Sequence, residues 1–256
     1  MLRKNSLYIY LLCLCTSLAL FHQAAADELP CPSVQDQGCI FKHMDTLAAA
    51  IESDRWRDQA YRELAKSMAE RGLAQDAVSY IAKIANPDTK AMTIRGIAMA
   101  AAGLTLTPEA YQALFGALRA EAEKIEHPPS YGIALTYIAM AQAFAGDDAG
   151  ATQTAKDMGN PALRNKAFGE TAEIQAEFGK FDEAMQSITL IEDEAFRNKA
   201  FETIAKIFTD QGYLQEAYNT IQQIENPVRA ATALQYLIDT QTQTDAKAID
   251  AERHTP

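Results

Sequence analysis

Apolar residues recur along this chain at the spacing of helix faces, in segments separated by Gly residues and Asn-Pro pairs. Between about residues 55 and 241, apolar positions fall three or four residues apart, which gives each segment one apolar face. One such stripe occurs three times, at Ala77, Ile81 and Ile84, at Ala184, Ile188 and Ile191, and at Ala217, Ile221 and Ile224. No segment is a good candidate for a strand. The pattern predicts an all-α protein.

The pattern repeats with a period of about 33 residues. The segment RNKAF at residues 164–168 returns unchanged at residues 197–201. A Gly followed five residues later by Ala recurs at Gly72, Gly146, Gly179 and Gly212, and such a Gly is typical of a helix end. The units close with Asn86-Pro87, Asn160-Pro161 and Asn226-Pro227, where Pro stops a helix. We therefore expect two antiparallel helices in each unit.

Each unit also pairs a small residue with a large one. Seven positions before each Gly, with Gly103 taken for the second unit, stand Ala65, Gly96, Ala139, Ala172 and Ala205. Four positions earlier stand Tyr61, Met92, Leu135, Phe168 and Phe201. A small side chain lets the two helices of a unit approach closely, and the larger side chain fills the space beside it.

These spacings resemble those of the tetratricopeptide repeat family, over roughly residues 54–241. The resemblance implies an α-solenoid of antiparallel helix pairs that stack on one another. It also implies a groove, lined by the first helix of each pair, that binds a protein or peptide segment. The second unit departs from the pattern, because Leu104 to Pro108 follow Gly103 and a longer helix comes next. This departure puts the local curvature in doubt.

We expect four regions along the chain. Residues 1–26 resemble a signal peptide, residues 27–53 form a lead-in followed by a capping helix at about 42–53, and residues 54–241 hold the repeats. Five helix pairs would span about 55–225, with a single helix at about 228–241. Residues 242–256 form a polar tail.

The first 26 residues have the features of a cleaved export signal. Arg3 and Lys4 precede an apolar run over residues 7–21, and Ala24 to Ala26 match a signal-peptidase site. A retained membrane anchor is the alternative, although the run is short for a span. A lipid anchor is disfavoured, because Leu residues precede Cys13 and Cys15. We therefore expect a periplasmic protein without a membrane anchor after cleavage.

Two cysteines remain after such a cleavage, Cys31 and Cys39. They lie in a segment with Pro30, Pro32 and Gly38, and an oxidising compartment favours a disulfide between them. A metal or redox pair is the alternative. Such a pair prefers closer spacing or further His and Cys ligands.

The composition and motifs point away from catalysis and from polyanions. A net charge of −11 disfavours nucleic acid and anionic membranes as partners. No phosphate loop, nucleophile elbow or paired His motif is present, so we expect no enzyme, no cofactor and no metal. The repeated arginines Arg164, Arg197 and Arg229 could form an anion-binding ladder, but pairing with acids of the next unit, such as Glu192 or Glu225, is the simpler interpretation.

The resemblance also indicates which residues would line the groove. Its apolar floor would include Ile97, Ala101, Ile133, Met140 and Phe144, and its polar rim Arg62, Lys66, Lys199 and Lys206. Exposed Met and Phe suit adaptable contact with an amphipathic segment. The alternative is that Met140 and Phe144 belong to the core, or that the long second unit covers them.

Two functions remain open from these observations. The chain is expected to be an interaction module or scaffold of the cell envelope that binds a partner segment in its groove. The alternative is a permanent structural or accessory subunit of an envelope assembly, whose groove is always filled.

Overall fold

The computed structural model describes residues 31–253, with side chains described through residue 242. These residues form helices joined by turns, without a strand among them, which confirms the all-α prediction. The expected signal peptide, residues 1–26, lies outside the described residues. Contacts divide the chain into two parts, residues 1–50 and residues 51–256.

Within residues 1–50, the described part is a disulfide loop that leads into helix α2 (Gln37–Ala49). The predicted disulfide between Cys31 and Cys39 is present. The helix begins about five residues earlier than expected, because the Asp36 side chain accepts a hydrogen bond from the backbone N–H of Cys39 and caps the first turn.

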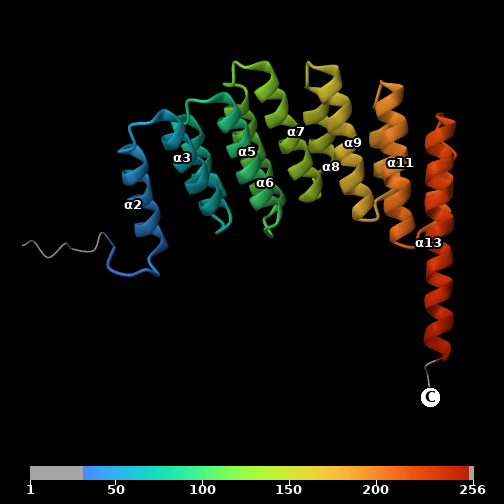
Figure 1. Cartoon of the computed structure of the whole chain (residues 1–256). Coiled ribbons are helices and arrows are strands. Elements are labelled where there is room, and N and C mark those ends of the chain that lie inside the picture. Colours follow the sequence, from blue (N-terminus) through green and yellow to red (C-terminus); the bar gives the residue numbers. More distant parts are fainter. Residues whose placement is uncertain (1–30, 254–256) are drawn as a thin grey trace, which may run out of the picture. The chain divides into compact units, whose positions relative to one another are not determined.

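The described residues from 51 onward contain the five predicted helix pairs and one further helix (Figure 1). The first helices of the pairs are α3 (Asp54–Ala69), α5 (Pro87–Ala102), α7 (Pro128–Phe144), α9 (Pro161–Glu177) and α11 (Glu194–Asp210). The second helices are α4 (Ala74–Ala77) with the 3-10 helix η1 (Val78–Lys83), α6 (Pro108–Ala122), α8 (Asp148–Lys156), α10 (Phe181–Thr189) and α12 (Leu214–Ile221). Helix α13 (Pro227–Arg253) follows the fifth pair.

The helix pairs stack in chain order. Each first helix contacts the first helix of the next pair, from α3 to α5 and onward to α13, and each pair's own two helices pack against each other. In Figure 1 the first helices stand side by side in one row. Each pair therefore buries its apolar faces against its partner and its neighbours.

Four of the turns inside the pairs depend on Gly. Gly72, Gly146, Gly179 and Gly212 have φ between 68° and 83°, as their position at a helix end predicts. Gly103 is different, with φ −80°, because the loop from α5 to α6 does not make the tight left-handed turn.

The Asn-Pro pairs begin helices and do not end them, so this part of the interpretation was wrong. Asn86, Asn160 and Asn226 accept hydrogen bonds from backbone N–H groups of the first turn that follows, and Pro occupies the first helical position. Pro suits that position because it has no N–H to leave unpaired.

Counting from these N-terminal caps corrects the register of the second unit. The N-cap positions of the five first helices are Ser53, Asn86, His127, Asn160 and Asp193. Twelve residues after each of these stands an alanine exposed by no more than 1% of its surface: Ala65, Ala98, Ala139, Ala172 and Ala205. The close-packed residue of α5 is therefore Ala98, and not Gly96, and the large neighbour is Ile94, and not Met92. The register counted back from Gly103 was wrong, because Gly103 lies two residues closer to the N-cap of its helix than the equivalent glycines of the other units do.

Buried polar side chains join one pair to the turn before the next. Asp58 accepts hydrogen bonds from the backbone N–H groups of Ala85 and Asn86, at 3.0 and 2.8 Å. Asn198 does the same for Glu225 and Asn226, at 2.7 and 3.1 Å. Each contact satisfies backbone donors at the end of a second helix, which fixes where the next first helix begins.

Helix α13 runs further than expected, to Arg253 and not to about Gln241. The sequence from residue 242 to 253 contains three Ala residues and no Gly or Pro, so nothing in it terminates a helix.

Candidate interaction surface on the first helices

One face of α7 carries apolar side chains that reach the surface. Ile133, Tyr137, Met140 and Phe144 are spaced four, three and four residues apart, so they form one stripe along the helix, here called the central stripe. Ile133 is 37% exposed, and the other three are half-buried. Met140 and Phe144 rest on a buried cluster of Ala143, Ala151 and Ile174. Three of the expected floor residues, at 133, 140 and 144, thus lie together at the surface.

The other two expected floor residues, Ile97 and Ala101, are fully buried, so the expectation that they line the surface is wrong. They were counted from Gly103, and the two-residue shift places them at core positions. The α5 residues at the register of the central stripe are Met92 and Met99, and both are half-buried.

Arg95 links α5 to the central stripe. Its guanidinium lies over the Tyr137 ring, 4.8 Å from the ring centroid. Such a cation–π contact places a positive charge beside the apolar area and holds the tyrosine ring in position.

The four expected rim residues lie on the first helices at either side of the central stripe. On α3, Lys66 pairs with Glu70 at 3.6 Å, and Arg62 is half-buried. On α11, Lys206 pairs with Glu202 at 2.6 Å, and Lys199 is exposed. We call the surface from α3 to α11 that includes these residues and the central stripe the first-helix face.

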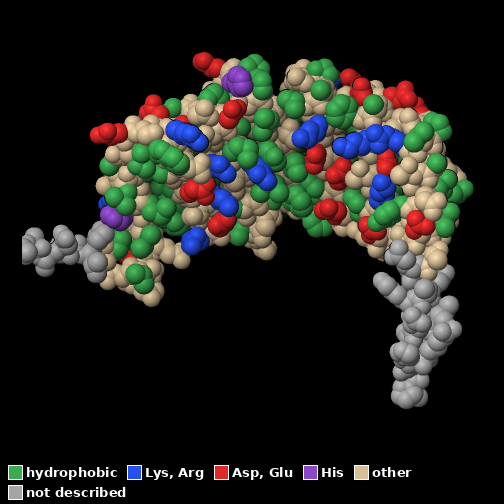
Figure 2. Space-filling model, in the orientation of Figure 1, with side chains coloured by type: hydrophobic (Ala, Val, Ile, Leu, Met, Phe, Trp, Pro, Cys, Tyr) green, Lys and Arg blue, Asp and Glu red, His purple; other side chains and the backbone are tan. Residues whose placement is uncertain are grey.

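The space-filling view shows this distribution of side chains (Figure 2). Hydrophobic side chains gather over α7 in the middle of the row, and Lys, Arg, Asp and Glu side chains gather on both sides of them. An apolar area bordered by charges is typical of a surface that meets another protein.

Three glutamates on α9, next to the central stripe, were not predicted as site residues. Glu170, Glu173 and Glu177 lie three and four residues apart, at the register of the first-helix face. Burial is the largest cause of a raised pKa of Glu173, which is about 7. The charges of Glu170 and Glu177 raise this pKa further, and the charge of Lys199 lowers it in part. Their spacing was visible in the sequence, but their partial burial depends on the neighbouring helices.

Two of the repeated arginines pair with the predicted acids, but these acids lie at the end of the same unit and not in the adjacent one. Arg164 pairs with Glu192 at 2.9 Å, and Arg197 pairs with Glu225 at 3.3 Å. Arg229 lies at a different register and pairs with Glu202 at 2.6 Å. These arginines are therefore bound to acids in the row, which leaves no free ladder of cations among the three.

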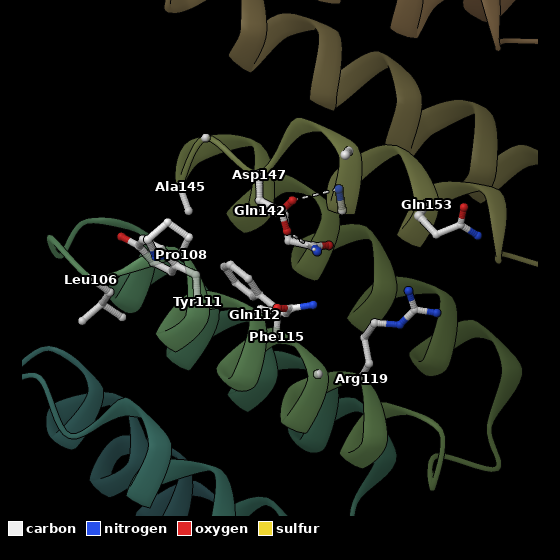
Figure 3. Close-up of a pocket in the computed structure, with 14 residues that line it drawn as sticks. Leu106, Pro108, Tyr111, Gln112, Phe115, Arg119, Gln142, Ala145, Asp147 and Gln153 are labelled. Atoms are coloured by element: carbon white, nitrogen blue, oxygen red, sulfur yellow. Dashed lines mark hydrogen bonds between the residues drawn. The ribbon is translucent and has the colours of Figure 1, made fainter.

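A hollow of about 710 Å³ lies on the side of the second helices, between α6 and α8 (Figure 3). Leu106, Pro108 and Tyr111 line one end of it, and Arg119 and Gln153 line the other.

The polar side chains of this hollow are bound to one another. Gln142 donates to Asp147 at 3.0 Å and accepts from Thr154 at 2.7 Å. A hydrogen bond from Arg119 lowers the pKa of Asp157, against the smaller opposing effect of burial. The next unit repeats this arrangement, with Ser187 donating to Gln175 at 2.7 Å. We therefore assign the network to stacking of the pairs.

Two further findings concern membranes and metals. Within the part of the chain that the structure describes, no helix is long and apolar enough to cross a membrane. In the same part, no group of three His, Cys, Asp or Glu side chains is placed to hold a metal ion.

Comparison with known proteins adds no assignment to these observations. No protein-family model matches the chain, and no curated protein matches it.

Proposed function

We propose that this protein is a binding module or scaffold of the cell envelope, a TPR-like α-solenoid whose first-helix face takes up a segment of a partner protein. The observation that carries the proposal is the central stripe, because an apolar row in the middle of a charged face is costly to leave in water. The row of helix pairs presents this stripe on a rigid support. The mode of binding would resemble other grooves that recognise an extended or helical segment.

The proposal includes export to the periplasm through cleavage of residues 1–26, and it assigns no catalytic activity and no cofactor. It rests on the charged and apolar pattern of those residues and on the disulfide between Cys31 and Cys39. The alternative function, a permanent accessory subunit of an envelope assembly, uses the same face. It differs in that the partner would stay bound.

Photo-cross-linking in the producing cells tests the proposed function. A photoreactive amino acid at Met140 should give a discrete adduct with another protein, whereas the same amino acid at Gln186, exposed on α10, should not. Loss of the Met140 adduct in an Ile133→Asp variant, with unchanged helical circular dichroism, would support binding at the central stripe. As a matched control, Val228→Asp changes an apolar residue that is 73% exposed on α13 and should leave the adduct intact.

Absence of an adduct at Met140, or equal adducts at Met140 and Gln186, would contradict the proposal. The amount of partner that remains bound after dilution of the purified complex separates the two functions. A scaffold releases its partner, and a permanent subunit keeps it.

A further inference from the structure

The glutamates of α9 lie directly beside the central stripe. Helix α9 packs against α7, and at the end of the two helices the rings of Phe144 and Phe178 meet edge to face, with their centroids 6.1 Å apart. Phe178 is 55% exposed. A segment that covers the central stripe and continues along the row therefore reaches Glu170, Glu173 and Glu177 next.

These three carboxylates differ from the other acids of the first-helix face in having no direct partner. On α11, Glu202 receives both Lys206 and Arg229, each at 2.6 Å, and the hydroxyl of Tyr236 donates to Asp210 at 2.6 Å. On α3, Glu70 is paired with Lys66. Among the described residues, no hydrogen bond or ion pair reaches the carboxylate groups of these three glutamates, although the Gln211 side chain donates to the backbone carbonyl of Glu177. Lys199 acts on Glu173 through its charge.

The repulsion and hydration of these carboxylates decide which kind of partner segment can cover them. Neighbouring carboxylates repel one another, and a neutral or acidic segment laid over them would displace water without replacing its hydrogen bonds. A basic side chain supplies both the opposite charge and the donors. The net charge of −11 favours the approach of such a segment.

We propose that the segment bound by the first-helix face combines apolar side chains, which cover the central stripe, with a Lys or Arg that pairs with Glu173 and Glu170. This inference rests on the proposed function. Neighbouring helix axes lie about 8–10 Å apart, and an extended chain rises about 3.3 Å per residue. The basic residue therefore stands about three positions from the apolar residue over Met140.

The titration of Glu173 gives the interaction a dependence on pH. The charged groups that act on Glu173 are Glu170 and Glu177 on its own helix and Lys199 on α11, and the central stripe of α7 contains no Asp, Glu, Lys, Arg or His. Because the pKa of Glu173 is raised to about 7, its carboxylate is mostly ionised at about pH 8 and mostly protonated at about pH 6. Affinity for a basic segment should therefore fall on acidification across this range.

Fluorescence anisotropy with synthetic peptides tests the inference on the full exported chain. The probe is a short fluorescein-labelled peptide with Leu and Phe and with a Lys about three positions beyond the Phe. Two matched peptides carry norleucine or Glu in place of that Lys. Each of the three peptides is also made with its sequence reversed, so that either direction of binding is tested. The Lys peptide should bind about three- to tenfold more tightly than the norleucine peptide at about pH 8, and the Glu peptide should bind most weakly.

A pair of variants connects the preference to Glu173. Glu173→Gln should remove most of the preference for Lys and the loss of affinity between about pH 8 and pH 6. Glu183→Gln, which removes one exposed carboxylate on α10, changes the net charge equally and should preserve both.

The outcomes separate this inference from the proposed function. Equal affinity for the three peptides, or an unchanged preference in Glu173→Gln, overturns the inference and leaves the proposed function standing. Absence of binding by all the peptides also overturns the inference, and cross-linking at Met140 then decides the proposed function separately.

Discussion

At the scale of single residues, Thr171 stands out among the core positions of the first helices. It is fully buried, and its hydroxyl oxygen has no hydrogen-bond partner. Apolar side chains occupy the same register in the other pairs, at Leu64, Ile97, Ile138 and Ile204. A buried hydroxyl without a partner destabilises the fold, because it gives up its hydrogen bonds to water.

We expect Thr171→Val to raise the free energy of unfolding by about 1 kcal/mol, because valine has nearly the same shape and no polar atom. Urea denaturation followed by circular dichroism measures the change. Thr209→Val is the matched control, since Thr209 is also buried but donates to the carbonyl oxygen of Ala205 at 2.8 Å. The control should not be stabilised, and a loss of stability in Thr171→Val would contradict the interpretation.

At the scale of the helices and turns, two glycines should respond in opposite ways to alanine. Gly212 ends α11 with φ 82°, a conformation that costs an L-residue about 1 kcal/mol or more. Gly116 lies inside α6, and a Cβ atom there would meet nothing within 4 Å. We expect Gly212→Ala to lower the melting temperature.

Gly116→Ala should instead raise the free energy of unfolding by about 0.5–1 kcal/mol, because alanine restricts the unfolded chain and favours the helix. Thermal unfolding of both variants in the same buffer tests whether Gly212→Ala lowers the stability and Gly116→Ala raises it. If both changes destabilised the protein, the open space next to Gly116 would have to be filled by a contact in solution.

At the scale of the whole row, the 33-residue period predicts that one unit can be removed. Deletion of residues 160–192 takes out α9 and α10 and joins the turn after α8 to the cap of α11. Helix α11 brings the same packing residues to α7, since residues 197–201 repeat residues 164–168. We expect a protein that still unfolds cooperatively, with the same helical signal per residue and a lower melting temperature, because one stacking interface is lost.

Circular dichroism melting and analytical ultracentrifugation measure this outcome. A deletion of residues 165–187, which does not match the period, should abolish folding. The 33-residue deletion also removes the three glutamates of α9, so any preference for the Lys peptide should disappear with them. Failure of both deletions to fold would show that the units are not interchangeable.

The local structure of this protein follows from patterns in its sequence. Helix periodicity, the four glycines with positive φ and the two cysteines act within short stretches of chain, so they predicted the five helix pairs, the turns and the disulfide. The pairing of Arg164 with Glu192 and of Arg197 with Glu225 was also predictable, because both the arginine and the glutamate recur with the 33-residue period.

Which side chains face outward, and what charge they carry, depends on the packing of the helices. The loop between α5 and α6 shifts the register by two residues, which buries Ile97 and Ala101 and turns Met92 and Met99 toward the surface. A two-residue shift turns a helix face by more than half a circle, so a small error along the chain becomes a change of face. The raised pKa of Glu173 likewise depends on the helices packed around α9, because burial, its largest cause, arises only when α7 and α11 pack against α9.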